Sequence, residues 1–147
     1  KIELLWAVLC SGATIDQETK AISIVEVIEQ LQVEAKTDHL PSTFFVPRPV
    51  KFVSMWYRDT ANGKQSLFSK VIFRAPDGDV LKEVEAEMEL QAEKYRHRHI
   101  ISFDGIPLRQ SGQYTYEVLM KQKSTDQYKK VGFVPLNVEI TLNIEKV

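Results

Sequence analysis

A tight turn followed by an alternating strand, over residues 111–120, constrains the fold of this chain most. Gly112 tolerates a positive φ because it lacks a Cβ atom, so Ser111 and Gly112 predict a turn. The large side chains that follow share one parity, at Tyr114, Tyr116, Val118 and Met120. A period of two is typical of a strand that buries one face and leaves the other in solvent.

The spacing of Gly112 and Tyr114 resembles the tyrosine corner of immunoglobulin-like sandwiches. In that motif a tyrosine hydroxyl near the start of a late strand bonds to nearby backbone. Tyr116 stands where an antibody domain has its second cysteine, but the chain has only one cysteine, so that disulfide is absent. The resemblance is therefore to the architecture alone, and an ordinary strand after a Ser-Gly turn is the alternative.

Turn signals divide the rest of the chain into further short strands. Asn62-Gly63 and Pro76-Asp77-Gly78 predict tight turns, and Ser11-Gly12 is expected to end the first strand. Pro47 and Pro49 interrupt one strand, because proline cannot donate to a ladder, and place it at an edge or a bulge. The predicted strands cover 2–10, 21–33, 44–58, 67–74, 80–91, 100–103, 111–120 and 136–145.

Residues 80–91 are compatible with two structures. Their apolar residues fit a helical stripe, and Glu, Ala, Met and Leu favour helix. However, four glutamates alternate strictly with apolar residues, at Glu83, Glu85, Glu87 and Glu89. A strand would place all four on one solvent face, so we predict a strand. The segment that follows is predicted as a connection, with one short helix near 90–98 left open.

About eight strands separated by turns predict an all-β fold, an antiparallel β-sandwich of immunoglobulin-like or C2-like type. The chain has 147 residues, of which 44% are hydrophobic and 27% charged, so we expect one globular domain over 1–147. A net charge of -1 gives no general attraction to nucleic acid, and no apolar run approaches the roughly 18 residues of a membrane span. The lone Cys10 fits a reducing compartment such as the cytoplasm, and we expect it to be buried rather than nucleophilic.

Four segments together are similar to an uncharacterised bacterial β-sandwich family of unknown function. They are Leu-Leu-Trp-Ala-Val-Leu-Cys ending in Ser-Gly-Ala over 4–13, Ile-Ser-Ile-Val over 22–25, Phe-Asp-Gly-Ile-Pro-Leu over 103–108, and Ser-Gly-Gln-Tyr-Thr-Tyr-Glu-Val over 111–118. The resemblance implies a compact immunoglobulin-like or C2-like sandwich in a bacterial cytoplasm. It implies no activity and no site.

Two groups of residues are candidate metal ligands. If 95–99 is extended, His97 and His99 share one face and could bind zinc or copper, although a third ligand would be needed. A calcium site needs several oxygen ligands from loops at one end of the sandwich, which could group Asp38, Asp77, Asp79 and Asp104. The alternatives are a solvated basic connection and ordinary Asp-Gly turns.

Other chemistry has weaker signals. Arg96 and Arg98 could bind an anion through their forked donors. The sequence has no Gly-x-Ser-x-Gly motif and no glycine-rich phosphate loop, so we predict that the protein is not an enzyme and uses no cofactor.

An excess of apolar residues remains after one sandwich core is filled. Val53, Met55 and Tyr57 lie on the parity opposite to Phe52 and Trp56, so they form a second apolar face. We therefore predict a non-catalytic protein-interaction or structural module that binds a protein partner or a second copy through this face. The alternative function is a ligand- or ion-binding sandwich, using the Asp loops or the cluster at 96–99.

Overall fold

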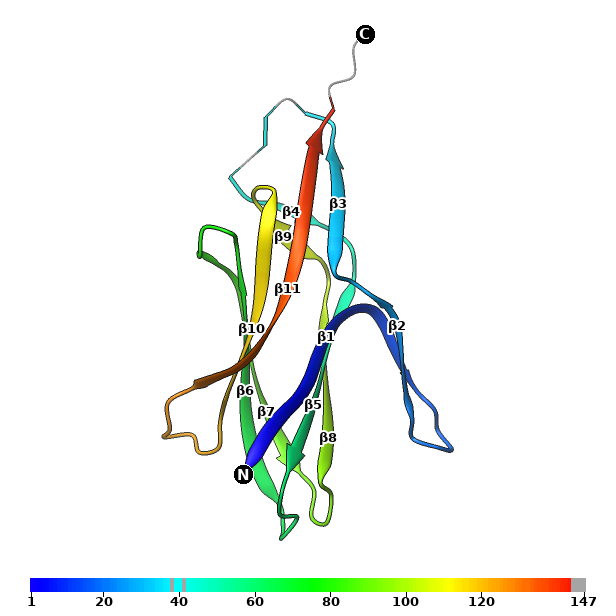
Figure 1. Ribbon diagram of the computed structural model, residues 1–147, viewed down its shortest axis with the longest axis vertical. Helices are drawn as coiled ribbons and strands as arrows, with labels where there is room; N and C mark the ends of the chain where they lie inside the picture. Colours follow the sequence, from blue (N-terminus) through cyan, green and yellow to red (C-terminus); the bar gives the residue numbers. More distant parts are fainter. Residues whose placement is uncertain (38, 41, 144–147) are drawn as a thin grey trace.

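The computed structural model of the protein describes residues 1–37, 39–40 and 42–143, and in these ranges the chain forms eleven strands and no helix. Four strands form one sheet in the order β2-β1-β5-β8, and five form a second in the order β3-β11-β10-β6-β7 (Figure 1). β4 and β9 form a separate ribbon. The bounds are β1 (Ile2–Ile15), β2 (Ile22–Val27), β3 (Gln30–Ala35), β4 (Phe44–Val46), β5 (Val50–Arg58), β6 (Gln65–Arg74), β7 (Val80–Leu90), β8 (Arg96–Phe103), β9 (Ile106–Leu108), β10 (Gly112–Lys121) and β11 (Lys129–Leu142).

The predicted all-β sandwich is confirmed, because one hydrophobic cluster draws on both larger sheets. The pairing is antiparallel apart from β3, which lies parallel to β11. The count exceeds the predicted eight because two predicted strands are each divided and because 106–108, predicted as a turn, forms β9. No helix among the described residues has the length and apolar character needed to cross a membrane.

The first strand is longer than predicted. Ser11-Gly12 was expected to end it, but β1 continues to Ile15 and Gly12 lies opposite Val25. The first half of β1 pairs with β5, and the second half turns away from the body as a hairpin with β2 (Figure 1). The prediction of a turn was wrong because Gly12 lies in a hairpin strand, where Ser-Gly is tolerated.

The predicted single strand over 21–33 is divided between the two sheets. β2 ends at Val27, and β3 begins at Gln30. Between them the N–H of Ile28 donates to the C=O of Leu9 (2.8 Å), and the C=O of Glu29 accepts from the N–H of Asn137 (3.1 Å). The chain therefore crosses from one sheet to the other at 28–29 and bonds to each on the way.

Residues 80–91 are a strand, as predicted, and the helix left open near 90–98 is not found. The four glutamates lie on the exposed face, opposite residues such as Lys70, whose Nζ lies 2.6 Å from a carboxylate oxygen of Glu83. Residues 91–95 form a turn in which Glu93 has a φ of 66° and donates its N–H to the C=O of Ala61 (2.9 Å).

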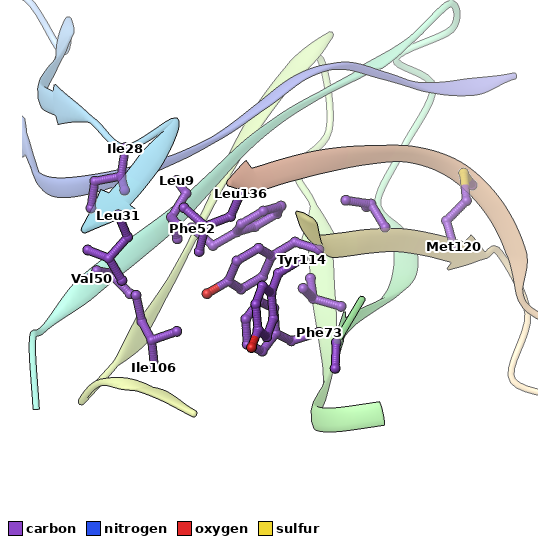
Figure 2. Packing of buried hydrophobic residues seen from close by; sticks show 14 of the residues in the cluster. Leu9, Ile28, Leu31, Val50, Phe52, Phe73, Ile106, Tyr114, Met120 and Leu136 are labelled. Carbon is purple, nitrogen blue, oxygen red and sulfur yellow. The ribbon is translucent and has the colours of Figure 1, made fainter. Parts of the chain in front are cut away.

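The core consists of the inward side chains of both sheets (Figure 2). Phe73 lies at its centre, with its ring centroid 4.3 Å from that of Tyr116 and 5.5 Å from that of Tyr114. Phe52 stacks on Tyr116 from the opposite sheet, with centroids 5.5 Å apart. Burying each such ring contributes about 1.5–3 kcal/mol, so this aromatic cluster holds the two sheets together.

The predicted tyrosine corner is confirmed. The hydroxyl of Tyr114 donates to the C=O of Gln110 (2.7 Å) and accepts from the N–H groups of Gln110 (3.0 Å) and Arg109 (2.8 Å). Gly112 allows the turn, since its φ is 144° and a Cβ there would lie 2.8 Å from Cγ of Pro76. One buried side chain thus fixes the backbone that precedes its own strand.

The corner gives a stability prediction. Tyr114→Phe keeps the buried ring but removes the hydroxyl, so we expect the free energy of unfolding to fall by about 1–3 kcal/mol. Urea unfolding followed by tryptophan fluorescence measures this change. Tyr116→Phe, two residues on in the same core, is the control and should cost less. Equal losses for the two variants would contradict the role of the corner.

Candidate functional site

Strands β7 and β8 end their respective sheets on the same side of the sandwich. β7 is the last strand of the five-stranded sheet, β8 is the last strand of the four-stranded sheet, and residues 91–95 join them. We call this side, formed by β7, β8 and residues 91–95, the β7–β8 edge. An end strand presents backbone N–H and C=O groups that no neighbouring strand uses.

The register of β8 shows which of its backbone groups are free. The N–H of Arg58 donates to the C=O of Tyr95 (2.9 Å), and Trp56 follows opposite His97. Antiparallel strands alternate between residues that bond to the neighbour and residues that point away from it. The outward backbone groups of β8 therefore belong to the even-numbered residues Arg96, Arg98, Ile100 and Ser102.

The side chains of β8 alternate as predicted. His97 and His99 lie opposite the buried residues Trp56 and Ser54, so they face the core. Arg96 and Arg98 lie on the outer face of the sheet. The strand therefore presents histidines to the interior and arginines, together with its free backbone groups, to the exterior.

The outer face around β8 carries unpaired positive charge. The guanidinium of Arg98 donates to the C=O of Lys20 (2.6 Å), and Nζ of Lys51 on β5 donates to Oγ of Ser102 (2.9 Å). Within the described ranges no carboxylate lies in ion-pair distance of Arg96, Arg98 or Lys51. An acidic group placed beside β8 would thus meet cations that, within the described ranges, are not paired with a carboxylate.

An apolar groove of about 480 Å³ lies between β7 and β8 at the end away from their connecting turn. Its apolar lining is Phe45, Leu81, Val84, Ile101, Phe103 and Pro107, and its polar lining includes Lys82, Ser102 and Asp104. The side chain of Phe45 is 56% exposed, which is unusual for a phenylalanine beside a core. The groove can therefore accept further apolar side chains.

A buried arginine holds the turn of the β7–β8 edge in place. Arg58 is only 2% exposed, and its guanidinium donates to the C=O of Lys94 (3.0 Å) and to that of Gln91 (2.5 Å). Burying this charge is favourable only because these carbonyls take the place of water. Residue patterns do not predict this role, since an arginine at the end of a strand is usually solvated.

β2 and β3 are the end strands on the opposite side of the sandwich, and the parts of β1 and β11 that they leave uncovered are protected against strand pairing. There β2 pairs with β1 only from Cys10 onward, and β3 pairs with β11 only from Asn137 onward. Both unpaired stretches contain a bulge, between Leu4 and Trp6 in β1 and beside Gly132 in β11. Pro135 in β11 also lacks an N–H. Bulges and proline are the usual means of blunting an edge, whereas β8 pairs with β5 without any irregularity.

The predicted calcium ligands are only partly brought together. Asp77 and Asp79 share a turn, where Arg109 binds both, with Nη1 3.3 Å from Asp77 and 2.6 Å from Asp79. Asp104 lines the groove between β7 and β8, and Asp38 lies outside the described residues. In the described part of the chain no three His, Cys, Asp or Glu side chains could hold a metal ion. Calcium at the Asp loops and zinc or copper at His97 and His99 remain predictions.

The predicted apolar face is less open than expected. Val53 is fully buried although it points away from the main core, and Met55 and Tyr57 are half-buried. The contact of Arg98 with the C=O of Lys20 ties the turn of the β1–β2 hairpin to this face. Val53 therefore cannot form an exposed patch, which corrects its predicted place on an open apolar face. The alternation of residues does not show in which direction the hairpin runs, so the sequence could not predict this burial.

Two further features lie away from the β7–β8 edge, a buried cysteine and a second groove. Cys10 is fully buried, and burial raises the pKa of its thiol, which matches its expected role as a small hydrophobe. A groove of about 860 Å³ lies between Lys1–Leu4 and 120–131. Two of its lysines have partners within the chain, since Lys130 pairs with Glu117 (3.0 Å) and Lys121 lies over the ring of Tyr128 (4.5 Å to the centroid).

Comparisons with known proteins support the fold. No protein-family model and no curated protein sequence matches the chain. Among solved structures, the C-terminal domain of Wzt is similar, with a TM-score of 0.51 and 9% identity over 97% of this chain and 76% of that one. The N-terminal domain of PorA gives a TM-score of 0.32 and 11% identity over 94% of this chain and 99% of that one. At these identities the likeness to the Wzt domain concerns the fold alone.

The inward histidines of β8 give a pH prediction. Burial lowers the pKa of both His97 and His99, and the positive charge of Arg58 adds to the effect at His97. The folded state therefore binds fewer protons than the unfolded state. The free energy of unfolding should fall as pH is lowered through the ordinary histidine pKa of about 6.5. Urea titrations between about pH 7.5 and pH 5.5 measure the slope. His97→Gln/His99→Gln should flatten it, and an unchanged slope would contradict the assignment.

Proposed function

We propose that this protein is a non-catalytic binding module that takes up an extended polypeptide segment as an added strand beside β8. The observation that carries this proposal is the edge of β8 itself. It offers four outward residues in a regular register, with no bulge and no proline among them. Strand addition uses such main-chain groups for affinity and the flanking side chains for specificity.

The chemistry on the two sides of β8 indicates which segment would fit. An added strand would place alternate side chains on the outer face, beside Arg96 and Arg98, and the others toward the interior. Near the far end of β8, the interior side leads to the groove lined by Ile101, Phe103 and Leu81. A segment in which acidic residues alternate with apolar ones therefore matches both sides.

The distribution of shifted groups supports a role without catalysis. Among the described residues, Glu117 has its pKa lowered by Arg74, and Lys70 has its pKa raised by Glu83, both within ion pairs on the exposed face of the five-stranded sheet. Cys10 and Tyr116 have raised pKa values because they are buried in packed side chains. None of these four lines the groove beside β8, and neither do His97 and His99, the two histidines of β8 whose pKa values burial lowers.

Peptide binding tests the proposal. A fluorescein-labelled eight-residue peptide that alternates Glu with Val and Leu is titrated with the protein, and its fluorescence anisotropy is measured. We expect saturable binding that weakens with salt, because the outer-face contacts are ionic. Arg96→Glu/Arg98→Glu should weaken the affinity by about tenfold or more, equivalent to about 1.4 kcal/mol.

Two controls separate strand addition from charge attraction. A peptide of the same composition with its glutamates grouped at one end keeps the net charge but loses the alternation, so it should bind weakly. Lys123→Glu removes an exposed cation in the connection between β10 and β11 and should leave the affinity unchanged. Equal binding of both peptides, or an equal effect of the Lys123 substitution, would contradict the proposal.

A further inference from the structure

The β7–β8 edge carries two rows of opposite charge that cannot meet within one copy of the chain. The glutamates of β7 lie on the outer face of the five-stranded sheet, and Arg96 and Arg98 lie on the outer face of the four-stranded sheet. The two sheets pack through their inner faces, so the two rows point away from each other. Neither row therefore neutralises the other in the isolated protein.

The two rows nevertheless occupy the same end of the edge. Only residues 91–95 separate the last residue of β7 from the first residue of β8. Arg58 holds this turn by its hydrogen bonds to Gln91 and Lys94. Glu87 and Glu89 near the end of β7 thus lie level with Arg96 and Arg98 near the start of β8.

The geometry points to a second copy of this chain as an occupant of the β7–β8 edge. We propose that β8 of one copy pairs with β7 of another, and β7 of the first with β8 of the second, around a two-fold axis parallel to the strands. Such an axis exchanges the two layers of the sandwich but keeps each residue at its own height. It therefore brings Arg96 and Arg98 of each copy beside Glu87 and Glu89 of the other, on one continuous sheet face.

Strand direction agrees with this arrangement. β7 and β8 are joined by a short turn and run in opposite directions, and a two-fold axis parallel to them leaves each direction unchanged. β8 of one copy and β7 of the second are then antiparallel, as most other neighbours in this protein are. Both sheets continue across the contact, and the interface is the same patch on both copies.

The charges select this pairing over the other symmetric ones. Pairing β7 with β7 would place glutamates beside glutamates, and pairing β8 with β8 would place arginines beside arginines, which is unfavourable across a sheet. The present partners of the two glutamates are weak and exposed. Oγ of Ser66 donates to Glu87 (3.2 Å), and Nζ of Lys64 lies 3.4 Å from Glu89. These contacts do not compete strongly with an arginine on a neighbouring strand.

This inference rests on the proposed function, since it names β7 of a second copy as an extended acidic and apolar strand that β8 accepts. It is narrower, because a module that binds a foreign segment need not bind itself. Val84, Ala86 and Met88 alternate with the glutamates of β7, so β7 has the pattern that the edge of β8 favours.

Charge exchange tests the dimer. Sedimentation velocity over a range of concentrations should show a monomer–dimer equilibrium for the unaltered chain, weaker at about 500 mM salt than at about 50 mM. Arg96→Glu/Arg98→Glu and Glu87→Lys/Glu89→Lys should each be monomeric alone. An equimolar mixture of the two variants should restore a dimer, because each contact again joins opposite charges. Lys123→Glu is the matched control and should dimerise normally.

Three results would overturn the dimer. They are a monomer at every concentration, a dimer that neither double variant weakens, and a mixture that stays monomeric although both variants are folded by circular dichroism. The peptide titration separates the two proposals. If the protein is monomeric but its peptide affinity depends on Arg96 and Arg98, the dimer is contradicted and strand addition still holds. If the protein is monomeric and does not bind the peptide, both proposals are contradicted.

Discussion

Backbone hydrogen bonding at the ends of the sheets is the constraint on which this structure depends. Each open sheet leaves N–H and C=O groups that must be protected, solvated or paired. On one side of the sandwich the chain blunts the uncovered parts of β1 and β11 with two bulges and Pro135. On the other side β8 remains regular and carries Arg96 and Arg98 on its outer face. The regular edge of β8 and the arginines beside it are the basis on which we propose a binding role, because a positively charged edge favours a strand of the opposite charge.

The aromatic core makes that edge possible. Phe52 and Phe103 of one sheet pack against Tyr116 of the other and so fix the two sheets against each other, and the hydroxyl of Tyr114 fixes the turn before β10. At the other end, Arg58 links β5 to the turn between β7 and β8. The end strands are therefore held by interactions with the body of the sandwich. A rigid edge loses less conformational entropy when a strand is added, which favours association.

Alternation made most of the fold predictable. It identified β10 with its tyrosine corner, β7 with its glutamate face, and the opposite orientations of His97 and Arg96. It failed where a strand changes its partners. Residue parity is the same whether β1 stops at Ser11 or turns into a hairpin, and it does not show that the chain changes sheets at 28–29. The candidate site was half predictable. The arginines were predicted to bind an anion, which stays a prediction, and their position at a free edge depends on strand order, just as the burial of Val53 depends on the direction of a hairpin.

The central claim, that β8 accepts an added strand, is tested most directly by amide hydrogen exchange measured residue by residue with NMR. In the free protein the amides of His97, His99 and Ile101 should exchange slowly because they bond to β5, while those of Arg96, Arg98 and Ile100 should exchange rapidly. Saturation with the alternating acidic peptide should slow Arg96, Arg98 and Ile100 by about tenfold or more and leave the others unchanged. Unchanged exchange at these three amides, or protection confined to a different strand, would contradict the account.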